Sequence, residues 1–419
     1  MGFCGFTDDR RIFKRQDSFR EACMIKPPSA ILASSIAPGI LGGGEQGALA
    51  YVQAISKVYD GDVIYVGPAP ADGGASLAGT KLRELIALPE RSLFRVASDL
   101  LLTGCLDRLS TSPITERIIA NAAPDRTIVY VFGEAAGKLV VQCRVRSLRT
   151  VFQCNNYMPE YLNAQMSRCN PVSKLIAGIR VKQGLLGFRM ASYRLCVSEQ
   201  DRQAYLKVTG ASPDDGASRG DMYFSYDEPW SAQAKDAGDQ RCRDTINVSA
   251  YLGQKFNERG ILWFLNSIWP AIRNEFPHLR LVVTGANPPA SIVQATGRAG
   301  GEMKVRPSPL EMNHVYARSL LSVAPTLDGS GIKVRVAESL RRGVPVLSTQ
   351  HCAVGYDKIS RSVLKLFADA GQAVAGVRDI VGGDRVQLGE ACITEWEREF
   401  SLAQGVRKLR EVHEWLATR

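Results

Sequence analysis

The stretch from Leu327 to Thr349, LDGSGIKVRVAESLRRGVPVLST, decides the fold of this chain. Its Gly-Ser-Gly segment at 329–331 predicts a loop whose backbone can approach a ligand closely. A helix is expected over 334–340, because apolar residues recur there at i, i+3 and i+6. Gly343 is expected to end the helix before an apolar strand at 346–349. The stretch therefore predicts a loop, a helix, a turn and a strand, as in a parallel α/β domain.

This predicted helix has the character of an anion site. A glycine loop that feeds a helix N-terminus directs free N–H groups and the positive end of the helix dipole at a ligand. One carboxylate, Glu338, stands on the helix among the basic residues Lys333, Arg335, Arg341 and Arg342. The combination suits a nucleotide, because cations and amides bind a diphosphate and a carboxylate accepts hydrogen bonds from ribose hydroxyls.

Strand and helix patterns alternate along both halves of the chain. In the first half, apolar strands are predicted at 29–35, 62–66, 127–132, 148–153 and 193–197, and helical patterns over 80–121. A second glycine loop at 42–44 follows the first of these strands. Such alternation predicts two parallel α/β domains facing each other across a cleft, with ligands at the carboxyl ends of the strands.

The run Glu338–Val346, ESLRRGVPV, resembles the nucleotide-sugar motif of glycosyltransferases with the two-domain GT-B fold, the retaining group called group 1 or family 4. The resemblance covers roughly 246–356, where a strand and glycine turn (247–260), a helix (263–270), a strand (279–285), and a helix and strand (314–325) follow in the family's order. In the first half it is limited to the glycine loop and the phrase VSEQD at 197–201. The resemblance implies two Rossmann-like, doubly wound domains around a central cleft. It also implies sugar transfer from a nucleotide diphosphate donor with retention of configuration.

The chain is expected to divide into five parts. These are an N-terminal tail or cap (1–27), a Rossmann-like acceptor domain (28–210), an interdomain connection (211–245), a Rossmann-like nucleotide-sugar domain (246–395) and a C-terminal helix (396–419). The last helix shows one apolar side over Glu395–Ala417. The resemblance implies that this helix crosses back to the first domain.

Three residues are expected to carry the chemistry. Arg259, in the Glu-Arg-Gly run at 258–260, and Lys333 are candidates to stabilise negative charge on the leaving diphosphate, and Glu338 is the candidate ribose ligand. The alternative for both cations is a solvated surface position. The expected donor-binding residues are Gly43, Gly44, Gly253, Gly329, Ser330, Gly331 and Ile332. We expect no metal and no cofactor besides the donor, because the Asp-Gly-Asp run at 60–62 reads as a plain turn.

The chain departs from the family's pattern at three places. Many members have a second glutamate at the position of Ser330, and an arginine at the position of Gln254. A histidine often lies near the sugar, whereas the corresponding loop here, 153–157, is Gln-Cys-Asn-Asn-Tyr. These departures leave the donor sugar open, and no catalytic base or nucleophile is assigned.

Composition supports a globular protein of two or three domains at 419 residues. Ten cysteines without metal-ligand spacing indicate a reducing compartment, and no run is apolar enough to cross a membrane, so we expect a cytoplasmic protein. The net charge of +10 is concentrated in Lys138–Arg194, where Glu160 is the one acid. That segment predicts either a contact with an anionic membrane surface or an ordinary amphipathic helix with a wet basic face. Nucleic acid is disfavoured, since no recognised module accompanies the charge.

Three functions agree with these patterns. The first is a retaining glycosyltransferase acting on a glycan or lipid-linked acceptor at the inner membrane face. The second is a GT-B-fold nucleotide-sugar epimerase, which uses the same donor site without an acceptor. The third is a non-catalytic nucleotide-sugar-binding protein, made conceivable by Ser330 and Gln254. The basic segment favours the first over the second, because a soluble epimerase needs no membrane patch.

Overall fold

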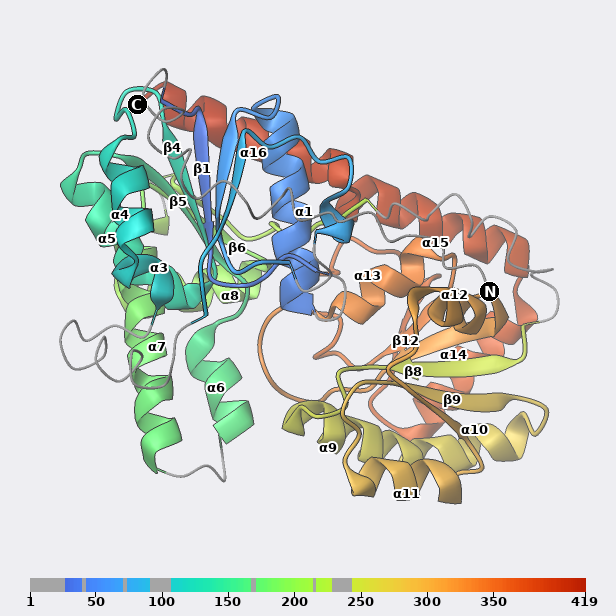
Figure 1. The fold of residues 1–419 in the computed structure, drawn as a ribbon. Coiled ribbons are helices and arrows are strands. Elements are labelled where there is room, and N and C mark those ends of the chain that lie inside the picture. Colours follow the sequence, from blue (N-terminus) through green and yellow to red (C-terminus); the bar gives the residue numbers. More distant parts are fainter. Residues whose placement is uncertain are drawn as a thin grey trace, which may run out of the picture.

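The computed structural model describes residues 27–39, 43–70, 74–90, 107–166, 171–213, 216–227 and 243–419. Residues 1–26 of the expected tail at 1–27 lie outside the described residues. So do Gly42 and residues 214–215 and 228–242 of the expected connection at 211–245. Within the described residues two lobes are seen, each built on one parallel sheet (Figure 1).

The first lobe contains a seven-stranded parallel sheet in the order β3-β2-β1-β4-β5-β6-β7. Its strands are β1 (Ala30–Ser34), β2 (Val63–Gly67), β3 (Glu84–Ala87), β4 (Ile128–Phe132), β5 (Arg149–Cys154), β6 (Tyr193–Cys196) and β7 (Ser218–Arg219). Every residue of β1, β2 and β4 is buried, which explains why these strands read as continuous apolar runs in the sequence.

The second lobe contains a six-stranded parallel sheet in the order β10-β9-β8-β11-β12-β13. Its strands are β8 (Thr245–Ser249), β9 (Arg280–Gly285), β10 (Glu302–Val305), β11 (Ser319–Ala324), β12 (Val346–Ser348) and β13 (Leu364–Leu366). In both sheets the chain starts at an inner strand, moves to one edge and returns to the other, so each lobe is doubly wound.

Helices cover both faces of each sheet. In the first lobe they are α1 (Gly43–Val58), η3 (Ala75–Leu77), α3 (Arg108–Thr111), α4 (Pro113–Ala120), η4 (Glu134–Ala136), α5 (Gly137–Val145), α6 (Met158–Met166), α7 (Pro171–Met190) and α8 (Glu199–Thr209). In the second they are α9 (Lys255–Trp263), η8 (Phe264–Ile268), α10 (Trp269–Glu275), α11 (Ala290–Arg298), α12 (Pro309–Arg318), α13 (Val334–Arg341), α14 (Ala370–Gly382) and α15 (Arg385–Phe400).

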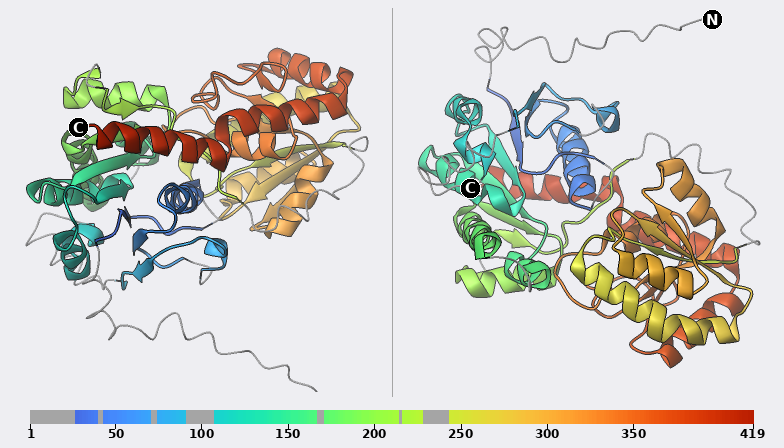
Figure 2. Two further views of the ribbon diagram at one scale, coloured as in Figure 1. Left: turned by 90° about the horizontal axis from the view of Figure 1, so that it is seen from above. Right: turned by 60° about the horizontal axis from the view of Figure 1, so that its bottom comes forward.

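A last helix, α16 (Leu402–Ala417), lies across the first lobe, as two further views show (Figure 2). Its buried side chains Leu402, Val406, Leu409, Val412 and Leu416 belong to the same apolar core as α1 and β1. The sequence predicted one helix over Glu395–Ala417, and this is wrong. Ser401 is extended (φ −65°, ψ 157°) and its hydroxyl caps α16 by accepting from Gln404 N–H, so α15 and α16 are separate helices.

Two other local predictions are wrong. The stretch 80–121 was predicted to be helical, but it contains the edge strand β3, which pairs with β2. The Glu-Arg-Gly run at 258–260 was predicted to be a turn, but it lies inside α9. Gly260 is needed there for packing rather than turning, because a Cβ would come within 2.4 Å of Pro325 O.

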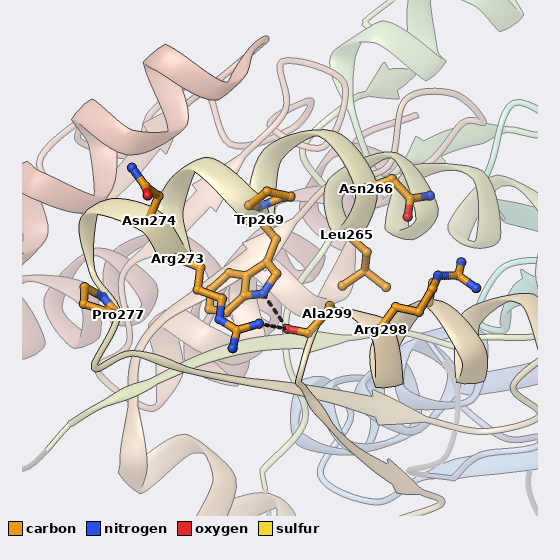
Figure 3. A pocket seen from close by; sticks show the side chains of 10 residues that line it. Leu265, Asn266, Trp269, Arg273, Asn274, Pro277, Arg298 and Ala299 are labelled. Carbon is orange, nitrogen blue, oxygen red and sulfur yellow. Dashed lines mark hydrogen bonds between the residues drawn. The ribbon is translucent and has the colours of Figure 1, made fainter.

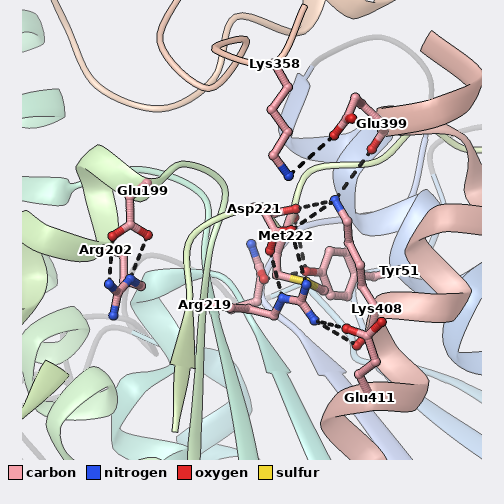
Figure 4. A network of polar contacts seen from close by, with 11 residues as sticks. Tyr51, Glu199, Arg202, Arg219, Asp221, Met222, Lys358, Glu399, Lys408 and Glu411 are labelled. Atoms are coloured by element: carbon pink, nitrogen blue, oxygen red, sulfur yellow. Dashed lines mark hydrogen bonds and ion pairs between the residues drawn. The ribbon is translucent and has the colours of Figure 1, made fainter. Parts of the chain in front are cut away.

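The chain passes between the lobes beside a buried lysine (Figure 4). Lys408 of α16 is 5% exposed, and its Nζ donates to Asp221 O at 2.7 Å and to Glu399 O at 3.5 Å. Arg219 pairs with the Asp221 carboxylate at 2.7 Å and with Glu411 of α16 at 2.8 Å. These contacts attach the segment around Asp221 and the end of α15 to α16.

No helix in the described ranges is long and apolar enough to cross a membrane.

Candidate functional site

The loop between β11 and α13 is shaped by two glycines with positive φ. Gly329 has φ 94° and Gly331 has φ 75°, a region that other residues adopt only with strain. At Gly331 a Cβ would also come within 2.4 Å of Asn156 Oδ1 and 2.7 Å of Asn155 O, both in the first lobe. Gly331 therefore allows the donor loop predicted from the sequence to lie directly against the other lobe.

Lys333, the residue before α13, is turned into this glycine loop. Its Nζ donates to Ser330 O at 3.0 Å and to Gly331 O at 2.9 Å, and it lies 5.9 Å from the ring centroid of Phe256. The residue is 6% exposed, and burial lowers the pKa of its ammonium group. Lys333 thus holds the loop closed while placing a positive charge at the helix N-terminus.

Glu338 is more buried than the sequence suggested. It is 8% exposed, and Arg342 Nη1 donates to its Oε2 at 2.5 Å. Its Oε1 is buried without a hydrogen-bond partner, with Arg341 Nη1 4.0 Å away. One oxygen is therefore held by the helix's own cation, and the other has accepting capacity left over.

Arg259 lies on α9, opposite the glycine loop. Its guanidinium pairs with the carboxylate of Asp328, the residue immediately before Gly329. Both side chains are close to half exposed, at 44% and 45%. Arg259 is therefore neither a remote surface cation nor a buried one, and it sits at the rim of the loop.

Of the other expected donor residues, Gly43 and Ile332 lie next to the glycine loop and α13, whereas the neighbours of Gly44 and Gly253 lie elsewhere. A Cβ on Gly43, the first residue of α1, would meet Val334 Cγ2 of α13 at 3.1 Å, so the two helices begin side by side. Gly44 follows Gly43 and faces Ile36. In the second lobe, Gly253 lies in the turn before α9, next to Asn287, and Ile332 packs beside Gly355.

The two lobes meet at the glycine loop. Ser330 Oγ donates to Tyr157 O at 3.0 Å, and Gln254 Nε2 donates to Tyr161 OH at 3.3 Å. Both residues stand at positions where the chain departs from the family's pattern, and here both bind the first lobe. Asp201 of α8 accepts from Tyr157 N–H at 3.2 Å within the first lobe and lies close to the N–H of Gly331 across the junction.

Glu134 stabilises the first-lobe side of this contact between the lobes. It follows β4, is 6% exposed, and accepts from Asn155 N–H at 2.5 Å and Asn156 N–H at 2.6 Å. Burial raises the pKa of its carboxyl to about 7, with the nearby Asp201 charge adding to the shift. Glu134 therefore fixes the backbone of the segment that faces Gly331.

His351 supports the loop from the side of β12. Burial, with a contribution from the positive charge of Lys333, lowers the pKa of its imidazole to about 4. Its Nε2 is buried without a hydrogen-bond partner. The ring is neutral at physiological pH and adds no charge to the site.

Sequence reasoning missed four of these residues: Glu134, Asp201, Asp328 and His351. Glu134 and His351 each follow a predicted strand closely, which was a usable indication, because side chains there face the ligand edge of a parallel sheet. Asp201 ends the quoted phrase at 197–201, and Asp328 begins the glycine loop. Their partners come from distant parts of the chain, so no local pattern reveals them.

A surface depression elsewhere does not belong to this site (Figure 3). It lies between η8, α10 and α11, where Arg273 and Trp269 both donate to Ala299 O. None of its lining residues belongs to the glycine loop, α13 or the first lobe. In the described ranges no cluster of histidine, cysteine and acidic residues could hold a metal ion.

Comparisons with known proteins agree with the fold. Residues 246–378 match the family model of glycosyl transferases group 1. An uncharacterized 44.6 kDa protein in the cps region of Klebsiella pneumoniae is 27% identical over 100 residues, which is 22% of this chain and 26% of that protein. The match thus spans about a quarter of that curated relative.

Solved structures match over nearly the whole chain. Anabaena Alr3699/HepE in complex with UDP and glucose has a TM-score of 0.60 at 13% identity, covering 92% of this chain and 99% of that one. The trehalose-6-phosphate synthase OtsA has a TM-score of 0.61 at 11% identity, covering 92% and 98%. Sucrose-phosphate synthase from Thermosynechococcus elongatus has a TM-score of 0.59 at 13% identity, also covering 92% and 98%. The predicted GT-B fold is confirmed.

Proposed function

We propose that this protein is a glycosyltransferase that moves a sugar from a nucleoside diphosphate donor to an acceptor hydroxyl with retention of configuration. The observation that carries the proposal is α13: it starts at a glycine loop with Lys333 at its N-terminus, and Glu338 on it keeps one buried oxygen without a hydrogen-bond partner. The match of residues 246–378 to the group 1 glycosyltransferase model supports the same conclusion. Retention rests on the resemblance of the Glu338–Val346 run to the retaining group.

The chemistry follows from the charges around the loop. Departure of the nucleoside diphosphate leaves negative charge on the phosphate, and fixed cations and amides stabilise that charge as it develops. Lys333, the N–H groups at the start of α13, and Arg259 are our candidates for this role. Glu338 Oε1 would accept from a ribose hydroxyl. This scheme uses no metal ion and no cofactor besides the donor.

The donor can be sought directly. HepE structures contain UDP and UDP-glucose, so UDP-sugars are the first donors to test. A donor that binds the folded state raises the melting temperature by mass action, and a panel of nucleotide sugars would identify it. Acceptor-dependent release of nucleoside diphosphate then tests the reaction. Donor turnover to an isomer without any acceptor would instead show an epimerase. Binding without either reaction would show a non-catalytic protein.

We further propose that the acceptor is a glycan or lipid-linked molecule presented at an anionic membrane surface, which α7 contacts from the cytoplasmic side. α6 and α7 project from the first lobe away from its sheet (Figure 1). On α7, Val172 and Leu175 are 66% and 63% exposed. The neighbouring Lys174, Arg180 and Lys182 are exposed as well. Exposed apolar and basic residues on one helix suit the headgroup region of a bilayer.

Two cations of the basic segment Lys138–Arg194 are engaged within the first lobe instead. Arg194 is 9% exposed and packs over the ring of Phe188, which is fully buried. Arg149 donates to the backbone oxygens of Asp125 and Leu416. These cations serve the fold of the first lobe, and they are not part of the proposed surface.

Vesicle binding tests the proposed surface. The wild type should bind anionic vesicles at low salt and release them as salt rises, because each cation contributes about 1 kcal/mol near the bilayer. Changing Lys174, Arg180 and Lys182 to glutamine should abolish binding. The control changes three exposed cations elsewhere, Lys207, Arg298 and Arg361, and should keep it. If both variants lost vesicle binding equally, the binding would depend on net charge alone, and α7 would not be the membrane contact.

A further inference from the structure

The donor loop is bordered by two carboxylates, and one of them occupies a group that a diphosphate would need. Asp328, from the loop itself, pairs with Arg259 of α9. Asp201, from α8 of the other lobe, lies close to the N–H of Gly331. Asp201 is 4% exposed and also lies within electrostatic range of Lys333.

Carboxylate and phosphate oxygens compete for the same donors, because both form charge-assisted hydrogen bonds with guanidinium and amide N–H groups. A diphosphate that reached Arg259 while Asp328 stayed in place would meet a carboxylate at bonding distance from the same guanidinium. Like charges that close repel each other. The pair must therefore open for Arg259 to serve the donor.

The Arg259–Asp328 pair is built to open. Its side chains are 44% and 45% exposed, and ion pairs this exposed contribute only about 0.2–1 kcal/mol. Asp328 precedes Gly329, whose φ of 94° is accessible to a glycine that can also adopt other conformations. Swinging Asp328 away would thus cost little in stability, whereas Asp201 is buried and changes at that residue would also disturb the lobe contact.

We propose that Asp328 is an internal competitor for the donor diphosphate: it holds Arg259 until the donor displaces it, and so lowers donor affinity. This inference rests on the proposed function, because it assigns Asp328 a part at the same donor site. The proposal predicts a change in donor affinity of unusual direction. Removing this polar residue from the rim of the binding site should make the donor bind more tightly. If Asp328 instead positioned Arg259 for the phosphate, removing it would weaken binding.

Calorimetric titration of UDP into the wild type and into Asp328→Asn tests the sign, with GDP and ADP titrated in parallel. We expect the variant to bind about three- to fivefold more tightly, the upper part of what an exposed ion pair can contribute. The gain should disappear in the Arg259→Ala background, because no guanidinium remains to be released.

Glu160→Gln is the matched control. Glu160 is exposed on α6 and lies within electrostatic range of Lys333 and Asp328, but it does not share Asp328's ion pair with Arg259. Glu160→Gln removes the same charge as Asp328→Asn. An equal gain in nucleotide affinity in both variants would therefore overturn the proposal in favour of a general electrostatic effect. Unchanged or weaker binding by Asp328→Asn would overturn it as well. Failure of wild type and variant alike to bind any of the three nucleotides would instead overturn the donor site and with it the proposed function.

Discussion

Helices α13 and α1 begin side by side, each after a glycine-containing loop, yet their surroundings differ in charge. Lys333 precedes α13, which carries Arg335, Glu338 and Arg341 and is followed by Arg342. α1 has Glu45 in its first turn, and from Ala48 to Ser56 it is buried in the core of the first lobe. Backbone geometry offers an anion site at both N-termini, but only α13 adds cations to it. The side chains, rather than the glycine loop, therefore distinguish a diphosphate site from a neutral one.

The difference in charge bears on which ligand we expect at each helix N-terminus. An acidic first turn on α1 disfavours a phosphate and is compatible with an acceptor rich in hydroxyl groups. Gly43 and Gly44 lie at this N-terminus, and their role as donor ligands stays a prediction. Gly43 remains a donor-site prediction through its contact with Val334 of α13.

The comparison is tested most strongly by Lys333→Ala, which removes the cation at the start of α13. Turnover should fall by about 10²–10³ at saturating donor, because charge on the leaving phosphate grows toward the transition state. The Michaelis constant for the donor should change less. Steady-state release of nucleoside diphosphate measures both. Lys255→Ala, an exposed lysine paired with Glu258, is the control and should keep turnover. If Lys333→Ala kept wild-type turnover, Lys333 would have no part in catalysis and would serve only the structure of the loop.

Site residues could be predicted from the sequence where they lie close together in one motif, and were missed where their partners lie far away in the sequence. Lys333 and Glu338 sit in one short motif whose spacing encodes loop, helix and strand, so both could be selected from the sequence. Asp201 and Glu134 reach the same loop from the first lobe, through contacts with Gly331 and Asn156 that only the folded chain creates. Contacts between the lobes produce no periodic pattern in the sequence.

The errors in the fold have a similar origin. β3 is a short edge strand with three of its four residues only partly buried, so it lacks the apolar run that marked β1. The break at Ser401 was hidden because apolar residues continue on both sides of it, and one capping hydroxyl sufficed to separate α15 from α16. Buried central strands were predicted well, since covering both faces demands continuous apolar sequence.

The junction between the lobes can be tested through Glu134, whose folded-state pKa is raised by burial from 4.5 to about 7. A raised pKa means that the folded state favours the protonated acid. The resulting stability is present below the unfolded pKa and is lost as pH rises toward 7, by about 3 kcal/mol in all. Glu134→Gln keeps an acceptor for the Asn155 and Asn156 N–H groups but cannot titrate. Denaturant unfolding from pH 4 to 8 should show this loss in the wild type and a flatter profile in the variant. Parallel profiles would contradict the assignment.

Glu338→Gln tests the carboxylate of α13. Donor affinity should fall by about 1.5–3 kcal/mol, the range for hydrogen bonds to a charged group. Because Glu338 is 8% exposed and paired with Arg342, some loss of melting temperature is also expected. Calorimetry on the folded variant separates the two effects. Glu390→Gln, an exposed glutamate on α15, is the control. Unchanged donor affinity would remove Glu338 from the ribose site.

The smallest expected effect concerns the contact between the two helices themselves. Gly43→Ala would place a methyl group 3.1 Å from Val334 Cγ2, so α1 and α13 must separate by a few tenths of an ångström. We expect kcat/KM to fall by up to about fivefold, equivalent to about 1 kcal/mol, since small displacements at a packed contact are felt but tolerated. Val334→Ala in the same background should restore part of the loss by making room. Gly297→Ala on α11 serves as the control, because an added methyl group there would meet nothing within 4 Å. If Gly43→Ala and Gly297→Ala behaved alike, the closeness of α1 to α13 would have no part in catalysis, and the two glycine loops would act independently.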